Sequence, residues 1–274
     1  MDDKDLEGIR GWFAGYCQSF YSVDMEDQRN ILLKEEHTHR VCANIIRIAA
    51  AEGLGSEDLK LAETIALLHD VGRFEQYRQF RTFRDAVSVN HAALGAGIIR
   101  DVDLLAWLSP RERDLVNDSV EAHNLFKIPK TIQGEHRFFL QLIRDADKLD
   151  IWRVFSEYYG QPEGERSSVA GLGFPDIPEC SPEVLEKVAG RETVRLSHAK
   201  TLNDFKLVQL SWIYDLVFPE SFNMVVEREI VNGIASWLPE TKAARLAVET
   251  VRYFVDERRP LSPVSSMTSV PQSS

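Results

Sequence analysis

Apolar residues recur along most of this chain at intervals of three and four positions, which is the spacing of one buried face of an α-helix. One such stripe follows His37 and consists of Val41, Ile45, Ile48 and Ala49. A second stripe leads directly into the polar pair His69-Asp70 and consists of Leu61, Ile65 and Leu68. No segment combines the alternating pattern of a β-strand with a hairpin turn, so the sequence predicts an all-α fold.

Residues at the ends of these stripes predict where helices begin and end. Ser56 precedes two acidic residues, a combination typical of an N-cap followed by the first helical turn. We expect that helix to carry His69-Asp70 near its C-terminal end and to stop near Gly72. The motif Ser109-Pro110-Arg111-Glu112 unites a capping residue, a proline at the first helical position and a capping-box glutamate. It predicts a helix that ends near His123.

A further helix is predicted to deliver Asp147, because an apolar helical face precedes this residue and consists of Phe138, Phe139, Leu142, Ile143 and Ala146. Residues 174–182 are rich in proline and predict a loop, and three helical stretches are expected at 202–218, 221–238 and 239–258. Serine and proline dominate 260–274, so we expect a disordered tail there. The predicted organisation is a helical core over residues 1–160, a helical C-terminal extension packed on it over 161–259, and the tail.

The composition is that of an ordinary globular protein, with 44% hydrophobic and 27% charged residues. A net charge of −11 disfavours nucleic-acid polymers and anionic membranes as partners, although a local cation site would still attract a small anion. The three cysteines are isolated and odd in number, which suits a reducing compartment. The acidic start is not that of a signal peptide and no apolar run suits a membrane span, so we expect a cytoplasmic protein.

The candidate chemistry lies in six residues of types that bind divalent cations through nitrogen or carboxylate oxygen. They are His37, His69, Asp70, His91, His123 and Asp147. The pair His69-Asp70 is the most informative, since an apolar run delivers two polar groups to a surface that should be buried, where a metal ion would satisfy both. Four neutral imidazoles and two carboxylates carry two negative charges against the four positive charges of two divalent ions. Such a site would attract an anionic substrate.

Three segments of the chain resemble the H…HD…D signature of the HD-domain superfamily of metal-dependent phosphohydrolases. They are His37-Thr38-His39-Arg40-Val41, Leu67-Leu68-His69-Asp70-Val71-Gly72-Arg73 and Arg144-Asp145-Ala146-Asp147-Lys148-Leu149-Asp150. The resemblance spans about residues 30–155 and selects His37 over His39 as the first ligand. It also selects Asp147, rather than the flanking aspartates, as the last ligand.

His91 and His123 are similar to the two extra histidines of binuclear members of this superfamily. The resemblance therefore implies an all-α, HD/PDEase-like helical bundle that binds one or two divalent ions, from among Mn, Fe, Mg, Ni, Co and Zn. It implies hydrolysis of a phosphate ester or anhydride in a small nucleotide-like or phosphorylated metabolite. No HD-GYP motif is present, so cleavage of cyclic di-GMP is not indicated.

Four residues are the candidates for catalysis in this interpretation. His69 and Asp70 would act at the metal site, with Asp70 bridging two ions. Arg73 would either clamp the phosphate or bind free carbonyls at a helix end. Lys148 would either reach the phosphate or pair with a neighbouring acidic residue.

Two alternatives stay open at the level of the sequence. HD-fold di-iron oxygenases, which cleave C–C or C–P bonds with O₂, use the same six ligand types in the same order. A non-catalytic nucleotide sensor is the other alternative, although an intact ligand set argues against it. The C-terminal third carries no motif, and we expect it to supply a lid or the surface of a homodimer. His136 and His198 are expected at the protein surface.

Overall fold

The computed structural model describes residues 1–160 and 173–259. Within these ranges every regular element is a helix, which confirms the predicted all-α fold. The predicted disordered tail lies outside the described residues. No helix in these ranges has both the length and the apolar character needed to cross a membrane.

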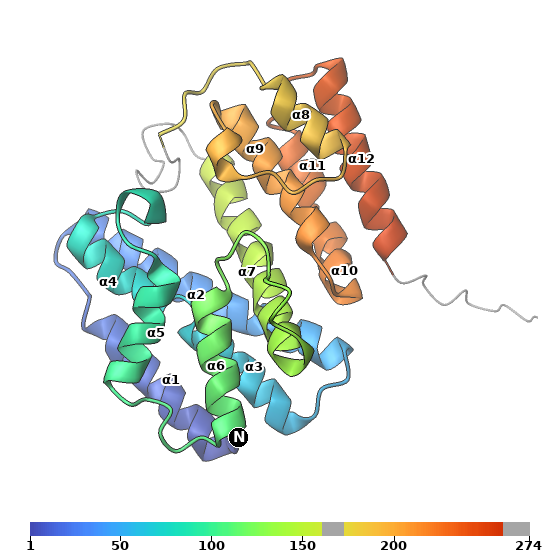
Figure 1. The fold of residues 1–274 in the computed structure, drawn as a ribbon. Coiled ribbons are helices and arrows are strands. Elements are labelled where there is room, and N and C mark those ends of the chain that lie inside the picture. Colours follow the sequence, from blue (N-terminus) through green and yellow to red (C-terminus); the bar gives the residue numbers. More distant parts are fainter. Residues whose placement is uncertain (161–172, 260–274) are drawn as a thin grey trace, which may run out of the picture.

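The N-terminal part of the molecule, drawn in blue to green in Figure 1, is a bundle of helices packed around α2 and α7. The bundle consists of α1 (Asp3–Gln18), α2 (Met25–Ala51), α3 (Ser56–Leu68), α4 (Val71–Phe80), α5 (His91–Asp101), α6 (Pro110–Ala122) and α7 (Gly134–Gly160). Helix α2 packs along α3 and α7, whereas α4 packs on α5 and α5 packs on α6. Several helices that are consecutive in the sequence are therefore neighbours in space, whereas α1 packs on α3.

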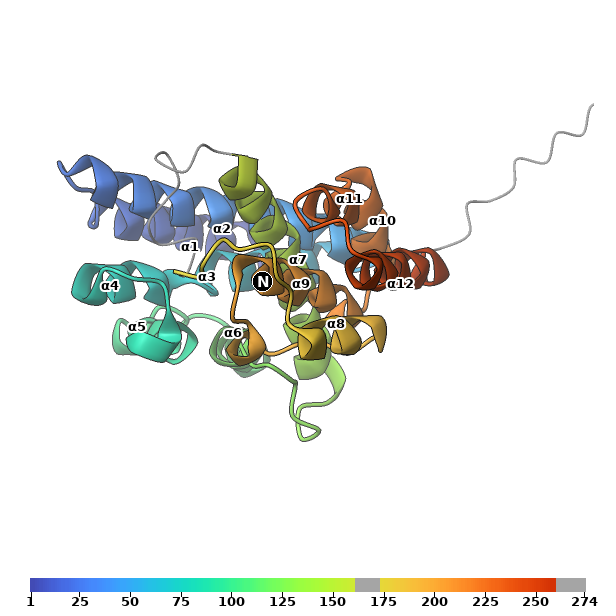
Figure 2. The same cartoon turned by 90° about the horizontal axis from the view of Figure 1, so that it is seen from above.

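The C-terminal helices gather on the other side of α7, as the two views in Figures 1 and 2 show. They are α8 (Pro182–Ala189), α9 (Leu202–Ser211), α10 (Pro219–Glu227), α11 (Ile230–Ala235) and α12 (Lys242–Arg258). Helix α7 contacts α2, α3 and α6 as well as α10 and α11. It therefore contacts both parts of the molecule.

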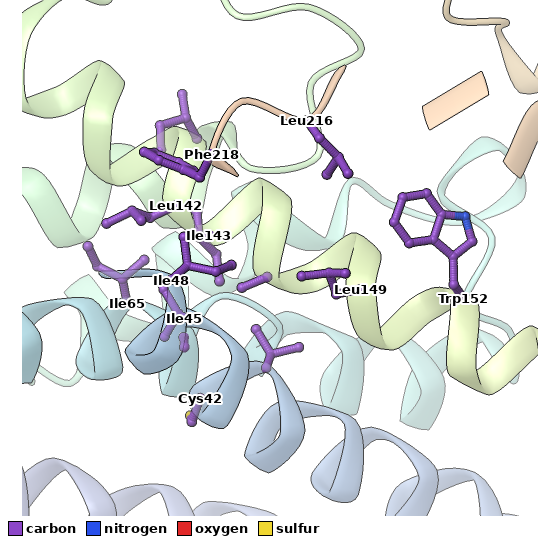
Figure 3. Close-up of a cluster of buried hydrophobic side chains, with 14 of the residues drawn as sticks. Cys42, Ile45, Ile48, Ile65, Leu142, Ile143, Leu149, Trp152, Leu216 and Phe218 are labelled. Atoms are coloured by element: carbon purple, nitrogen blue, oxygen red, sulfur yellow. The ribbon is translucent and has the colours of Figure 1, made fainter. Parts of the chain in front are cut away.

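Most buried apolar side chains belong to one connected cluster that extends from α1 to α12, and a small second cluster comprises Tyr159, Leu202 and Phe205. Figure 3 shows the centre of the large cluster, where Ile45 and Ile48 of α2 lie against Leu142 and Ile143 of α7. Further along α7, the fully buried Trp152 donates a hydrogen bond from Nε1 to the carbonyl oxygen of Gln209 in α9, at 3.0 Å. The C-terminal helices therefore complete the core of the bundle.

Several predicted helix ends differ from the structure. The N-cap of α3 is Gly55, and Ser56 is the first helical residue. The helix also does not run to Gly72: it ends at Leu68, and a new helix, α4, begins at Val71. By contrast, Ser109 caps α6 in the predicted capping box, and α6 ends next to His123 as expected.

Close packing between α4 and α5 requires a glycine at position 72. A Cβ atom on this residue would lie 2.6 Å from the backbone nitrogen of Gly95 and closer still to the carbonyl oxygen of His91. Glycine therefore allows the start of α5 to approach α4 backbone to backbone.

The C-terminal stretches are helical but more broken than predicted. The first contains α9 and a separate 3-10 turn, Trp212–Asp215, while the second divides into α10 and α11 at Glu229, whose φ is +51°. The third begins at Lys242 because Thr241 caps it, so its start is later than predicted. Helices α1, α4, α5 and α8 were not predicted.

Candidate metal centre

Six side chains from six helices or their ends meet beside the α3–α4 junction. His37 lies in α2 and Asp147 in α7, whereas His91 is the first residue of α5. His69 and Asp70 form the junction itself, and His123 directly follows α6. Helix ends therefore deliver four of the six side chains, and two long helices deliver the others.

The first donor group comprises His37, His69, Asp147 and atom Oδ2 of Asp70. Atom Oδ1 of Asp147 lies 3.1 Å from Nε2 of His37 and 3.8 Å from Nε2 of His69. Atom Oδ2 of Asp70 lies 3.6 Å and 3.7 Å from the same two nitrogens. His37, His69 and Asp70 are all buried and can share one ion.

The second donor group comprises His91, His123 and atom Oδ1 of Asp70. This oxygen lies 3.2 Å from Nε2 of His91 and 3.7 Å from Nε2 of His123, and all three residues are buried. The two oxygens of Asp70 therefore face different groups. This is the arrangement that a bridging carboxylate between two ions requires.

All four histidines have their proton-bearing nitrogen fixed by an acceptor. Nδ1 of His69 and His123 lies 2.7 Å from a backbone carbonyl oxygen, of Ala66 and Val120 respectively. Nδ1 of His37 lies 2.8 Å from Oδ2 of Asp150, and Nδ1 of His91 lies 2.7 Å from Oδ2 of Asp85. Carbonyl and carboxylate oxygens only accept, so each Nδ1 must be the donor. The lone pair of each Nε2 then points into the centre.

These lone pairs have too few hydrogen-bond donors around them. Nε2 of His91 and Nε2 of His123 face one another at 3.0 Å, and both lack a proton in the tautomers assigned above. Nε2 of His37 and of His69 is buried without a hydrogen-bond partner. Buried acceptors that converge in this way repel one another unless a cation lies between them. The donor set and its geometry fit divalent metal ions.

The electrostatics of the centre favour the protonation states that metal ligands need. Burial lowers the pKa of His69 to about 4, and burial together with Arg73 lowers the pKa of His91. Burial tends to raise the pKa of Asp70, but Lys34 and the histidines hold it well below its usual value. Burial likewise opposes ionisation of Asp147, yet its histidine neighbours lower its pKa. Neutral imidazoles at His69 and His91 and ionised carboxylates at Asp70 and Asp147 are therefore the favoured forms.

His37 is the exception in this set. Burial and Lys34 tend to lower its pKa, but the nearby carboxylates of Asp147 and Asp150 raise it above the ordinary histidine value. A proton therefore competes with a metal ion for Nε2 of His37.

Three residues that contact the donor groups were not identified from the sequence. Asp150 and Asp85 orient His37 and His91, and the ammonium group of Lys34 lies 2.9 Å from Oδ2 of Asp70. Asp150 follows a ligand by three positions on a helix, and Lys34 precedes His37 by three. Helical spacing could have indicated both residues, since positions three apart share a face. Asp85 begins a short 3-10 turn in the α4–α5 connection, where no periodicity predicts its place.

The structure places Arg73 and Lys148 in different surroundings. Arg73 lies between two acidic residues: its Nη1 is 2.9 Å from Oδ1 of Asp85 and its Nε is 3.5 Å from Oδ1 of Asp70. It also donates a hydrogen bond to the carbonyl oxygen of Phe83. It therefore faces the centre, as a phosphate-binding residue would. Lys148 pairs instead with Asp215, at 2.8 Å. The lysine that contacts the donor groups is Lys34.

The remaining histidines lie away from the centre. His39 is exposed although it is two residues from His37. His136 is exposed and pairs with Asp118, and His198 is partly exposed and pairs with Glu183.

A cavity of about 540 Å³ opens beside both donor groups, and its wall includes His37 and His91. Three cations line it as well, Lys34, Arg73 and Arg84. A volume of this size suits a small molecule. An anion that enters the cavity would meet these cations next to the donor groups.

Comparison with known families supports this centre. Residues 35–152 match the family model of the HD domain, and this range contains all six donor residues. This match over residues 35–152 confirms the resemblance found in the sequence. Comparison with curated proteins and with solved structures gave no match.

Proposed function

We propose that this protein, with its HD domain at residues 35–152, is a metal-dependent hydrolase of phosphate esters or anhydrides. The observation that carries the proposal is the convergence of four histidine Nε2 atoms and two carboxylates beside a cavity lined by cations. The match to the HD domain supports metal-dependent hydrolysis as the general class of reaction. The charge distribution of the cavity supplies the preference for an anionic substrate.

Each part of the site has a distinct task in this proposal. The first donor group and the second donor group would each hold one divalent ion, with Asp70 shared between them. Such ions would lower the pKa of a water molecule and neutralise the charge that develops on the phosphoryl group. Arg73 and Lys34 would orient the phosphate, because both lie beside Asp70 and line the cavity. Asp150 and Asp85 would keep two of the histidine rings in their ligand orientation.

Asp70→Asn tests the proposal most directly, because it keeps the side-chain shape but removes the charge shared by both donor groups. We expect at least a roughly 100-fold loss of kcat/KM toward phosphate monoesters or diesters. Elemental analysis should show divalent metal in the parent protein and much less in the variant. Asp118→Asn is the matched control, since it removes a carboxylate that pairs with His136, and neither residue belongs to the donor groups or to the cavity wall.

The same assay distinguishes hydrolysis from an oxygenase reaction. A hydrolase turns over equally well without O₂, so anaerobic and aerobic rates should agree. Turnover that requires O₂, or full activity of Asp70→Asn, would contradict the proposal. Tight binding of phosphorylated compounds without any turnover would instead support a sensor.

A further inference from the structure

The cavity beside the donor groups has two chemically different ends. Its charged and polar lining is concentrated near the donor groups and comprises Lys34, His37, Arg73, Arg84, Asp85, His91 and Asn124. The rest of its wall is apolar and comprises Leu33, Phe83, Ala86, Ile151, Val154, Phe155, Leu196, Phe205 and Trp212. One ligand that fills the cavity must therefore match both ends.

The polar end suits a phosphate group. Lys34 is held by Asp70 and Arg73 is held by Asp85 and Asp70, so both cations have fixed positions. Arg84 has no acidic partner among the described residues and can meet the charge of an incoming anion. A dianionic group next to the donor groups would be stabilised by all three cations.

The apolar end comes from several elements that are far apart in the sequence. Ile151, Val154 and Phe155 belong to α7, one to two turns beyond the ligand Asp147. Phe205 of α9 packs edge-on against Phe155, with ring centroids 4.9 Å apart. Trp212, from the 3-10 turn after α9, adds a further ring to the wall. Helix α7 and the C-terminal helices therefore build this part of the apolar wall together.

We propose that the substrate is a phosphate ester of an apolar alcohol or phenol, with its phosphate at the donor groups and its alkyl or aryl group against this wall. The inference rests on the proposed hydrolase function and narrows its substrate class. A nucleotide or sugar phosphate fits less well, because the apolar residues offer its hydroxyl groups and base edges few side-chain hydrogen-bond partners. Polar groups buried without partners would weaken the binding of such substrates.

The reaction follows from this placement. Water adds to phosphorus, the bond between phosphorus and the ester oxygen breaks, and the leaving oxygen takes up the proton that the water gives up. The products are orthophosphate and the apolar alcohol. Binding of the apolar group remote from phosphorus then contributes to kcat/KM.

A series of n-alkyl phosphates from ethyl to octyl tests the substrate class, with a nucleoside monophosphate and a sugar phosphate for comparison. We expect kcat/KM to rise by roughly two- to fourfold per added methylene until the cavity is filled. Val154→Asn should reduce this dependence on chain length, because it introduces a polar group into the apolar wall. Val226→Asn makes the same change on α10, at a valine outside this cavity that is 38% exposed, and should leave the dependence unchanged.

Binding of n-alkyl phosphonates, which cannot be hydrolysed, gives a second measurement that does not depend on turnover. Calorimetry on the Mn²⁺-loaded protein should show the same tightening with chain length, and Val154→Asn should reduce it. Affinity and kcat/KM that do not change with chain length, or a preference for the nucleotide, would overturn the inference and leave the hydrolase function standing. If no phosphate is hydrolysed while chain-length-dependent binding persists, the proposed hydrolase is overturned and the apolar ligand class stands.

Discussion

The orientation of a histidine ligand depends on the acceptor behind it, and this centre uses two kinds of acceptor. His69 and His123 donate to backbone carbonyl oxygens, which no substitution of a side chain removes. His37 and His91 donate to the carboxylates of Asp150 and Asp85. Each donor group therefore contains one histidine whose orientation can be tested by changing the single carboxylate side chain that accepts its hydrogen bond.

Asp150→Asn tests this dependence in the first donor group. The amide can still accept a hydrogen bond from Nδ1 of His37, but it no longer makes the ring more basic. We expect the affinity for Mn²⁺ and the value of kcat/KM to fall by about 10- to 100-fold. Asp118→Asn alters a similar contact with the exposed His136 and should have no effect on either value. Equal behaviour of the two variants would show that Asp150 has only a structural role.

The affinity for metal ions should depend on pH through His37. Asp147 and Asp150 raise the pKa of His37, and its Nδ1 already donates to Asp150, so an added proton goes to Nε2. Below the raised pKa this proton competes with the ion, so affinity is full at higher pH and falls as the pH decreases. The fall should begin above pH 6.5, the ordinary histidine value. Titration calorimetry with Mn²⁺ from pH 8 to pH 5 would measure it, and an onset only near pH 4 would contradict this assignment.

Three of the candidate ligands could be recognised from apolar helical patterns in the sequence, whereas His37, His91 and His123 were selected by the resemblance to the HD superfamily. His69-Asp70 interrupts an apolar stripe, and Asp147 follows one. Asp85 has no such context, since the connection between α4 and α5 contains only a short 3-10 turn. The pairing of Lys148 with Asp215 was equally unpredictable, because it depends on how α7 meets residues that are distant in the sequence.

The α3–α4 junction is the element that organises the centre. The sequence predicted a helix that carries His69-Asp70 and stops near Gly72, and it did not predict a second helix directly after Leu68. The structure has the second helix, so His69 and Asp70 are held between two rigid elements. Asp70 can then direct one oxygen to each donor group. Capping patterns such as that of Ser109 predicted local helix starts well, because they need no tertiary information.

Gly72→Ala should disturb the second donor group through the contact between α4 and α5. The new methyl group would overlap the carbonyl oxygen of His91 and the backbone of Gly95, so the start of α5 must move away from α4. We expect a loss of about 1–3 kcal/mol in the free energy of unfolding. Binding of metal at His91 and His123 should weaken more than binding at the first donor group. Chemical denaturation and metal titration measure the two effects.

Gly97→Ala is the matched control for that substitution. Gly97 lies within the same helix, α5, and a Cβ atom there would meet nothing within 4 Å. Alanine is the better helix former, so this variant should be as stable as the parent or more stable, by up to about 1 kcal/mol. Destabilisation of both variants to the same extent would show that the close packing at Gly72 is not the cause.

At the scale of the whole molecule, α7 connects the proposed metal chemistry with the C-terminal helices. One part of this helix carries Asp147 and the next part lines the apolar end of the cavity. Polar contacts reinforce the connection, since Arg144 binds Asp215 at 2.6 Å and Arg228 binds Asn44 at 2.7 Å. The sequence predicted a helical extension there, but not that it supplies the wall of the cavity. That role depends on side chains brought together only by tertiary packing.

Unfolding of the full chain should therefore be a single cooperative transition. The buried cluster runs from α1 to α12 without a break, so neither part can unfold without exposing the core of the other. Mn²⁺ at about 100 times its Kd should stabilise the native state by about 2.7 kcal/mol, and this stabilisation should extend to α9 and α12. Scanning calorimetry and hydrogen exchange would measure both effects, with Asp70→Asn as the variant that does not respond to Mn²⁺. Two transitions, of which Mn²⁺ shifts only one, would instead show that residues 173–259 fold separately.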